Sequence, residues 1–264
     1  MNLFLRLPQS NANKTTVQDD ALKTTVPTTS ISSGQNSSIR ETEVDYVSRI
    51  IQARRWDDLT RLLRSRSRKE ISKVKDSTNL NLLGMALGSQ APANVVELIL
   101  QLNPQSVLER DDFGAVPLHL GCLNGISVEV MKILFKYDGG GQSAHVADND
   151  NRTALHHAVE FTCLTILQLH EDDSSSLSLV YEASTEVVEE LLNIAPENVH
   201  VITTRGDCPL DIPHEFKIKL NNKNEDKDPK IDEIYNLLKE ASLEIYRSCK
   251  KSWEMAGFDT NSSS

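Results

Sequence analysis

The hydrophobic pattern of this chain repeats a unit of two short helices. Apolar residues recur at spacings of three and four in the stretches "ANVVELIL", "VEVMKILF" and "TEVVEELL", and each stretch follows a shorter apolar segment with a central leucine. This spacing is typical of amphipathic helices that bury one face. The pattern therefore predicts an all-α chain of successive units, each with a turn, a short inner helix and an outer helix.

The central leucines, which we call anchor leucines, set the register of the units. They are separated by 35, 37 and 55 residues and are Leu83, Leu118, Leu155 and Leu210. The outer-helix stripes start 12 residues after the first two anchors, at Val95 and Val130, but 32 residues after the third, at Val187. Both registers agree if the third unit carries an insertion between its helices, near residues 161–182.

The turn of each unit has its own chemistry. Four residues before the anchor leucines stand glycine or asparagine, the residues that adopt positive φ at least cost; they are Asn79, Gly114, Asn151 and Gly206. Helix starts follow: Asn81 and Thr153 can cap, and Pro117 and Pro209 suit the first helical position. The sequence therefore predicts one tight turn before each inner helix.

These residues resemble ankyrin repeats over roughly residues 40–216. The family's Thr-Pro-Leu-His-x-Ala motif corresponds to "VPLHLG" and "TALHHA", and in degraded form to "NLLGMA" and "CPLDIP". Val116 and Cys208 replace the capping threonine, and Gly84 and Asp211 replace the histidine. The resemblance implies an ankyrin-repeat solenoid. It also implies that His119 and His156 brace their turns, and that a protein partner binds the turn tips and inner helices.

The predicted domain organisation places helical caps at both ends of the solenoid. The alternative for residues 1–38, a transit peptide, is disfavoured by Asp19 and Asp20. The carboxyl-terminal helix either seals the last repeat or binds a partner groove. The segments are a disordered Ser/Thr-rich stretch (1–38), an amino-terminal helical cap unit (39–75), three units (76–110, 111–147 and 148–202), a partial unit ended early by Pro213 (203–216), a polar linker (217–229), a capping helix (230–256) and a disordered tail (257–264).

The distribution of charge along the chain is uneven and adds one candidate binding region. The 264 residues have a formal net charge of −10, which gives no general attraction to nucleic acid. Between Gln52 and Asp76, however, nine Lys or Arg residues accompany four acids. This basic cluster is either a solvated helix end or a contact for an acidic protein, an import receptor or nucleic acid. Nucleic acid is least favoured because no aromatic residues interleave the arginines.

The chain offers no recognisable catalytic chemistry. It has no phosphate-binding loop, dinucleotide fingerprint or nucleophile elbow, and the "GGG" at 139–141 is interpreted as a flexible loop. A metal site built from histidines near Asp148 and Asp150 is disfavoured because the adjacent His156 and His157 face different directions on a helix. We therefore expect no enzyme, cofactor or metal; the other histidines considered are His145 and His170.

Cysteine usage and hydropathy indicate the cellular compartment in which we expect the protein. The four cysteines are far apart, which argues against zinc knuckles and a disulfide framework and favours reduced thiols. The amino terminus lacks a secretory hydrophobic region, and no apolar stretch approaches the ~20 residues that cross a bilayer. We expect a monomer in the cytoplasm, and alternatively in the nucleus, that binds protein partners and no membrane.

Two groups of residues follow from this interpretation. Predicted partner-binding residues are Asp112, Phe113, Asp150 and Arg152 at the turn tips, and Arg64, Arg66 and Arg68 in the basic cluster. Predicted structural repeat positions are Leu83, Gly114, Pro117, Leu118, His119, Asn151, Thr153, Leu155, His156, Gly206, Pro209 and Leu210.

Overall fold

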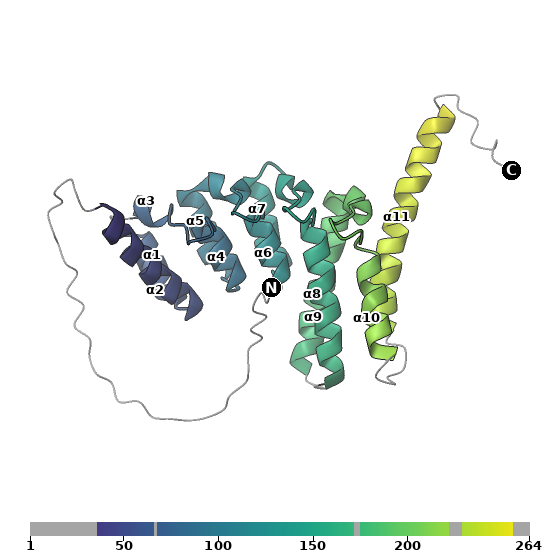
Figure 1. The fold of residues 1–264 in the computed structure, drawn as a ribbon, viewed down its shortest axis with the longest axis horizontal. Coiled ribbons are helices and arrows are strands. Elements are labelled where there is room, and N and C mark those ends of the chain that lie inside the picture. The colour runs from purple at the N-terminus through teal and green to yellow at the C-terminus, as the bar shows by residue number, and fades with distance from the viewer. Residues whose placement is uncertain (1–35, 66–67, 172–174, 222–228, 256–264) are drawn as a thin grey trace. The chain divides into compact units, whose positions relative to one another are not determined.

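The computed structural model describes residues 36–65, 68–171, 175–221 and 229–255 (Figure 1). Within these ranges there are helices and two isolated β-bridges but no strand, so the all-α prediction is confirmed. The segments predicted to be disordered, 1–38 and 257–264, lie outside these ranges except for residues 36–38, which begin a helix. The elements are α1 (Asn36–Gln52), α2 (Trp56–Leu63), α3 (Arg68–Ile71), α4 (Leu82–Gly88), α5 (Ala93–Leu102), η1 (Pro104–Leu108), α6 (Pro117–Leu123), α7 (Val128–Tyr137), η2 (Gln142–His145), α8 (Ala154–Glu171), α9 (Ser175–Ile194), η3 (Pro196–His200), α10 (Asp211–Asn221) and α11 (Pro229–Met255).

The helices stack in two rows. The inner helices α4, α6, α8 and α10 pack side by side in chain order, and the outer helices α2, α5, α7 and α9 pack in a second row (Figure 1). Leu83, Leu118 and Leu155 have no exposed surface and lie in the core between the rows, whereas the fourth anchor, Leu210, is half-buried. Each unit can bury its apolar face only against its neighbours, which is the packing principle of a solenoid.

The insertion in the third unit is helical. α8 has 18 residues and α9 has 20, whereas the inner helices α4 and α6 have seven each, and Figure 1 shows the pair extending beyond them. The added turns pack on the end of the array, because α8 contacts α10 and both α8 and α9 contact α11. Tyr181 is buried there, and its hydroxyl donates to Glu233 Oε2 at 2.8 Å.

The last helix pair corrects two boundaries of the sequence interpretation. Pro213 was expected to end the inner helix early, but α10 begins at Asp211 and continues to Asn221. Pro213 is therefore the third residue of the helix, where a backbone N–H has no intrahelical acceptor and its loss costs little. Residues 217–221, expected in the linker, are helical, and α10 packs against α11.

The glycine run at 139–141 forms a defined turn, which corrects its interpretation as a flexible loop. All three residues have positive φ, between 81° and 107°. The buried carboxylate of Asp138 accepts hydrogen bonds from the N–H groups of Gly141 at 2.7 Å and Ser143 at 2.8 Å. A Cβ at Gly141 would lie 2.5 Å from Ile194 Cγ2. Glycine is required here by backbone conformation and close packing.

Candidate protein-interaction surface

Each turn is closed by one side chain that sequence reasoning overlooked. Asp111 Oδ1 accepts from the N–H groups of Phe113 at 2.9 Å and Ala115 at 2.8 Å. Asp148 Oδ1 makes the same pair of bonds two and four residues further on, as does Asp76 in the first unit. Thr203 takes this place in the last unit. The sequence contained a signal for these turn-closing side chains, because each of them stands seven residues before an anchor leucine.

The four turn residues singled out by sequence adopt the left-handed conformation. Their φ angles are 58° at Asn79, 75° at Gly114, 58° at Asn151 and 95° at Gly206. At Gly114 a Cβ would also lie 2.4 Å from the side-chain oxygen of Asn149 in the next turn. The glycine therefore serves both the turn and the close approach of its neighbour.

Backbone hydrogen bonds join the tips of successive turns. Asp112 N donates to Thr78 O at 3.0 Å, Asn149 N to Phe113 O at 2.9 Å, and Thr204 N to Asp150 O at 2.9 Å. Asparagine side chains add further bonds: Asn79 Nδ2 donates to Asp112 Oδ1 at 2.6 Å, and Asn151 Nδ2 to Ile202 O at 2.6 Å. We call this edge, residues 76–79, 111–114, 148–151 and 203–206, the tip ladder.

The tip residues predicted to bind a partner differ in exposure and in how far their polar groups are already hydrogen-bonded. Phe113 is 56% exposed, and Asp112 and Asp150 are exposed as well. Asp112, however, uses its N–H, its carbonyl and Oδ1 within the tip ladder. The half-buried side chain of Arg152 pairs with Glu160 on α8. Phe113 and Asp150 thus present their side chains most freely.

The histidines of the repeat motif hold the turns to the inner helices. His119 Nδ1 accepts from Val116 N–H at 3.2 Å, so Nε2 carries the proton and donates to the carbonyl of Arg152 in the next unit at 3.1 Å. His156 Nδ1 accepts from Thr153 N–H at 3.1 Å. Where histidine is absent, Asp211 Oδ2 accepts from Cys208 N–H at 2.7 Å, and the Asn81 side chain caps α4 at Gly84 N–H.

Burial determines the charge state of these rings. It lowers the pKa of His119 to about 4, assisted by the nearby His157, and lowers the pKa of His156 to about 4, assisted by Arg152. Burial acts in the opposite direction on Asp148, but the hydrogen bonds from His157 and the Arg152 N–H outweigh it, so the pKa of Asp148 lies below its ordinary value. His119 and His156 are therefore neutral near pH 7.

Among the residues that the structure describes, the histidine-rich region brings together no set of metal ligands. His157 stacks edge-on against His119 with ring centroids 5.6 Å apart, and its Nε2 lies 3.5 Å from Asp148 Oδ2. His145 is engaged elsewhere, with Glu197 at 2.6 Å. Among the described residues no group of three metal-binding side chains occurs, and the side chain of His170 is outside that set.

Two of the four thiols are enclosed in the core. Cys122 and Cys163 are fully buried, and burial raises the pKa of the Cys122 thiol. A thiol held protonated in an apolar core is unreactive.

The basic cluster is only partly described. Arg64 is exposed at the end of α2. Arg66 and the side chain of Arg68 lie outside the described residues. Two further arginines, Arg55 and Arg61, pair with Asp58 at 2.5 and 2.9 Å.

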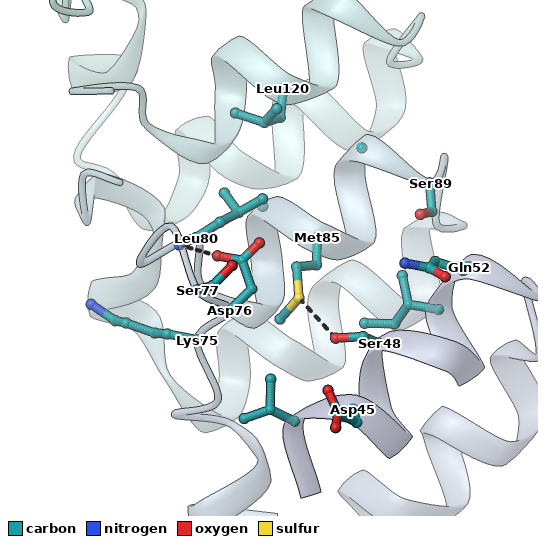
Figure 2. A pocket seen from close by; sticks show the side chains of 14 residues that line it. Asp45, Ser48, Gln52, Lys75, Asp76, Ser77, Leu80, Met85, Ser89 and Leu120 are labelled. Carbon is teal, nitrogen blue, oxygen red and sulfur yellow. Dashed lines mark hydrogen bonds between the residues drawn. The ribbon is translucent and has the colours of Figure 1, made fainter. Parts of the chain in front are cut away.

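A groove opens on the inner face beside the tip ladder. It has a volume of about 820 Å³ and is lined by α1, α4, the turn before α4, and Leu120 of α6 (Figure 2). Figure 2 shows Ser48 of α1 and Met85 of α4 facing each other, with the Ser48 hydroxyl 3.7 Å from the Met85 sulfur.

Comparison with known proteins identifies the repeat. Residues 83–173 match the family model for ankyrin repeats in three copies, and the match ends within the insertion of the third unit. No curated protein matches the sequence. No helix among the described residues is long and apolar enough to cross a membrane. Ankyrin repeats generally mediate protein–protein interactions. This chain therefore carries ankyrin repeats over residues 83–173, as the motifs "VPLHLG" and "TALHHA" indicated.

Proposed function

We propose that this protein is a non-catalytic adaptor that binds a protein partner on its tip ladder and the adjoining inner helices. The observation that carries the proposal is the position of Phe113. Its N–H donates to Asp111 Oδ1 and its carbonyl accepts from Asn149 N–H, both at 2.9 Å, while its side chain is 56% exposed. A large aromatic ring on a fixed backbone is the kind of residue that dominates binding energy at protein interfaces.

The rigidity of the tip ladder supports the same proposal. Surfaces that are ordered before binding lose little conformational entropy when a partner docks. The tip ladder is held by hydrogen bonds within and between turns, so Phe113 and Asp150 are presented in one arrangement. A partner would cover Phe113 and place hydrogen-bond donors against Asp150.

The proposal also covers the oligomeric state and the cellular compartment of the protein. We place the protein, as a monomer, in the cytoplasm or nucleus, where thiols remain reduced. None of the four cysteines forms a disulfide bond, which suits that environment. We assign the basic cluster no separate role; two of its nine members, Arg55 and Arg61, already pair with Asp58.

Affinity purification from nuclease-treated native extract, followed by mass spectrometry, tests the proposal. Wild type is compared with Phe113→Ala and with the triple variant Arg64→Glu, Arg66→Glu, Arg68→Glu. We expect a specific protein set that survives nuclease, is retained by the arginine variant and is depleted at least about tenfold by Phe113→Ala, as for an interface hot spot. A set that depends on nucleic acid, or that is lost only in the arginine variant, contradicts the proposal.

A further inference from the structure

The groove between α1 and α4 has an apolar floor that solvent reaches. Met85 and Leu120 are half-buried, and Val44 of α1 is half-buried on the opposite wall. Because apolar surface in a concave site gains free energy when a partner covers it, such a groove favours an apolar side chain from another molecule. Methionine adds adaptability, since its flexible side chain fits differently shaped partners.

Small residues keep the groove open. Gly88 at the end of α4, Ser89 directly after it and Ser48 of α1 all line it. A Cβ at Gly88 would meet only one atom within 4 Å, Asn124 Nδ2 at 4.0 Å, and its φ is not in the left-handed region. A Cβ at Gly88 is therefore accommodated without a close contact or an unfavourable φ, and a side chain there is added at the lining of the groove.

The charged groups at the groove leave it negative. Asp45, Lys75 and Asp76 are the charged residues that line it (Figure 2). Lys75 is neutralised by Glu109, whose Oε2 lies 3.1 Å from the ammonium. Oδ1 of Asp76 accepts hydrogen bonds from backbone N–H groups of its own turn. The exposed carboxylate of Asp45 has no ion-pair partner among the described residues. The exposed carboxylate of Asp45 and the half-buried carboxylate of Asp76 thus lie beside an apolar floor.

The repeats around the groove reinforce this negative charge. Residues 76–160 contain ten acidic and four basic side chains. All four basic groups are engaged: Lys132 and Lys136 pair with glutamates, Arg152 pairs with Glu160, and Arg110 donates to two carbonyls. Acidic side chains therefore outnumber basic ones on the repeat side of the groove, whereas residues 53–75 of the cap contain nine basic and three acidic side chains.

We propose that this groove binds a basic amphipathic helix of the protein partner. A leucine-sized side chain of the helix enters between Met85 and Val44, and flanking lysines or arginines meet Asp45 and Asp76. Helix-in-groove recognition uses apolar side chains at spacings of three and four, and the small residues of α4 leave space for them. This inference rests on the proposed function and names its partner class.

Fluorescence anisotropy with three labelled synthetic helices tests the groove. Each has about 14 residues, roughly four helical turns; one combines leucine with lysine, one leucine with glutamate, and one glutamine with lysine. We expect only the leucine–lysine helix to bind wild type. Gly88→Leu and Asp45→Lys each weaken its binding at least about tenfold, and Gly88→Ala weakens it less than Gly88→Leu.

Two variants outside the groove serve as matched controls. Glu189→Lys makes the same charge change as Asp45→Lys, and Ala183→Leu adds a leucine as Gly88→Leu does; both positions are exposed on α9. Each control is expected to bind the leucine–lysine helix within about twofold of wild type. Circular dichroism melts establish that every variant is folded before binding is measured.

Three outcomes overturn the inference: equal binding of the leucine–glutamate or glutamine–lysine helix, undiminished binding to Gly88→Leu, or an equal loss in Glu189→Lys. The proposed function stands separately from it. If the proteins captured from extract are depleted by Phe113→Ala but not by Gly88→Leu, the adaptor proposal holds and the groove is not its site.

Discussion

The imidazole Nε2 of His119 lies 3.1 Å from the carbonyl oxygen of Arg152, so the inner helix of one repeat is tied to the turn of the next. The other ring nitrogen bonds the N–H that begins its own helix. One buried side chain thus joins a helix, its own turn and a neighbouring turn, and several predictions about stability and pH depend on this bond.

Replacing His119 by alanine is expected to destabilise the array by about 2–4 kcal/mol, because two buried backbone groups lose partners and a cavity remains. Urea unfolding followed by circular dichroism measures the loss. His145→Ala is the control, since that exposed ring pairs with the exposed Glu197, and its loss should cost less than about 0.5 kcal/mol. Equal losses in both variants would mean that the bridge to Arg152 contributes nothing.

On acidification, the repeats should unfold at a higher pH than they would without the buried histidines. The folded-state pKa of His119 and of His156 is about 4, below the unfolded value of 6.5. A histidine whose pKa is lower in the folded protein than in the unfolded chain costs no stability above pH 6.5. As the pH falls from 6.5 to about 4, protonation of the unfolded chain lowers the free energy of unfolding by at most about 3 kcal/mol for each of the two rings.

Urea midpoints measured between pH 7.5 and 4 test this dependence. His119→Gln removes one titrating ring, so its stability should fall less steeply over the same range than that of wild type. If the two curves are parallel, the protonation of His119 is not coupled to folding.

The glycine run allows backbone strain and packing to be separated. Gly140→Ala and Gly141→Ala both place a side chain at positive φ, 100° and 107° respectively, which costs about 1–2 kcal/mol. Only at Gly141 does the new Cβ meet Ile194, whereas nothing lies within 4 Å at Gly140. Gly141→Ala should therefore be the less stable variant by a further 1–3 kcal/mol or so. Thermal and urea unfolding compare the pair, and equal stabilities would contradict the close packing.

Tyr181→Phe tests how the insertion holds the carboxyl-terminal helix. The change removes the hydroxyl that donates to Glu233 at 2.8 Å but keeps the ring in the core. A loss of about 0.5–1.5 kcal/mol is expected. Hydrogen exchange should become faster in α11 around residues 231–238 and stay unchanged in α4 and α6. Uniform acceleration throughout the chain would indicate that the bond stabilises the whole array and not this end alone.

Much of the candidate surface was visible in local sequence. The turns, the positive φ of Gly114 and Asn151, and the exposure of Phe113 follow from residues within one unit. The engagement of Arg152 with Glu160 could not be foreseen, because the sequence does not state which rotamer and which partner a long side chain selects.

The sequence by itself determined the properties that depend on neighbours along the chain. Glycine and asparagine set the turns, the spacing of apolar residues set the helices, and the anchor leucines set the register, because each acts within a few residues through backbone conformation or helix periodicity. A proline also has a local effect, but Pro213 shows that its outcome depends on where the helix starts.

Tertiary structure alone decided the groove, the tip ladder and the course of the insertion. The groove exists because α1 and α4 face each other through small side chains, and the tip ladder exists because consecutive turns meet at hydrogen-bonding distance. The insertion became two longer helices because Tyr181 of α9 could be buried at the end of the array, where α8 contacts α10 and both α8 and α9 contact α11. These features depend on distances between elements, which packing of the whole array sets and no local pattern encodes.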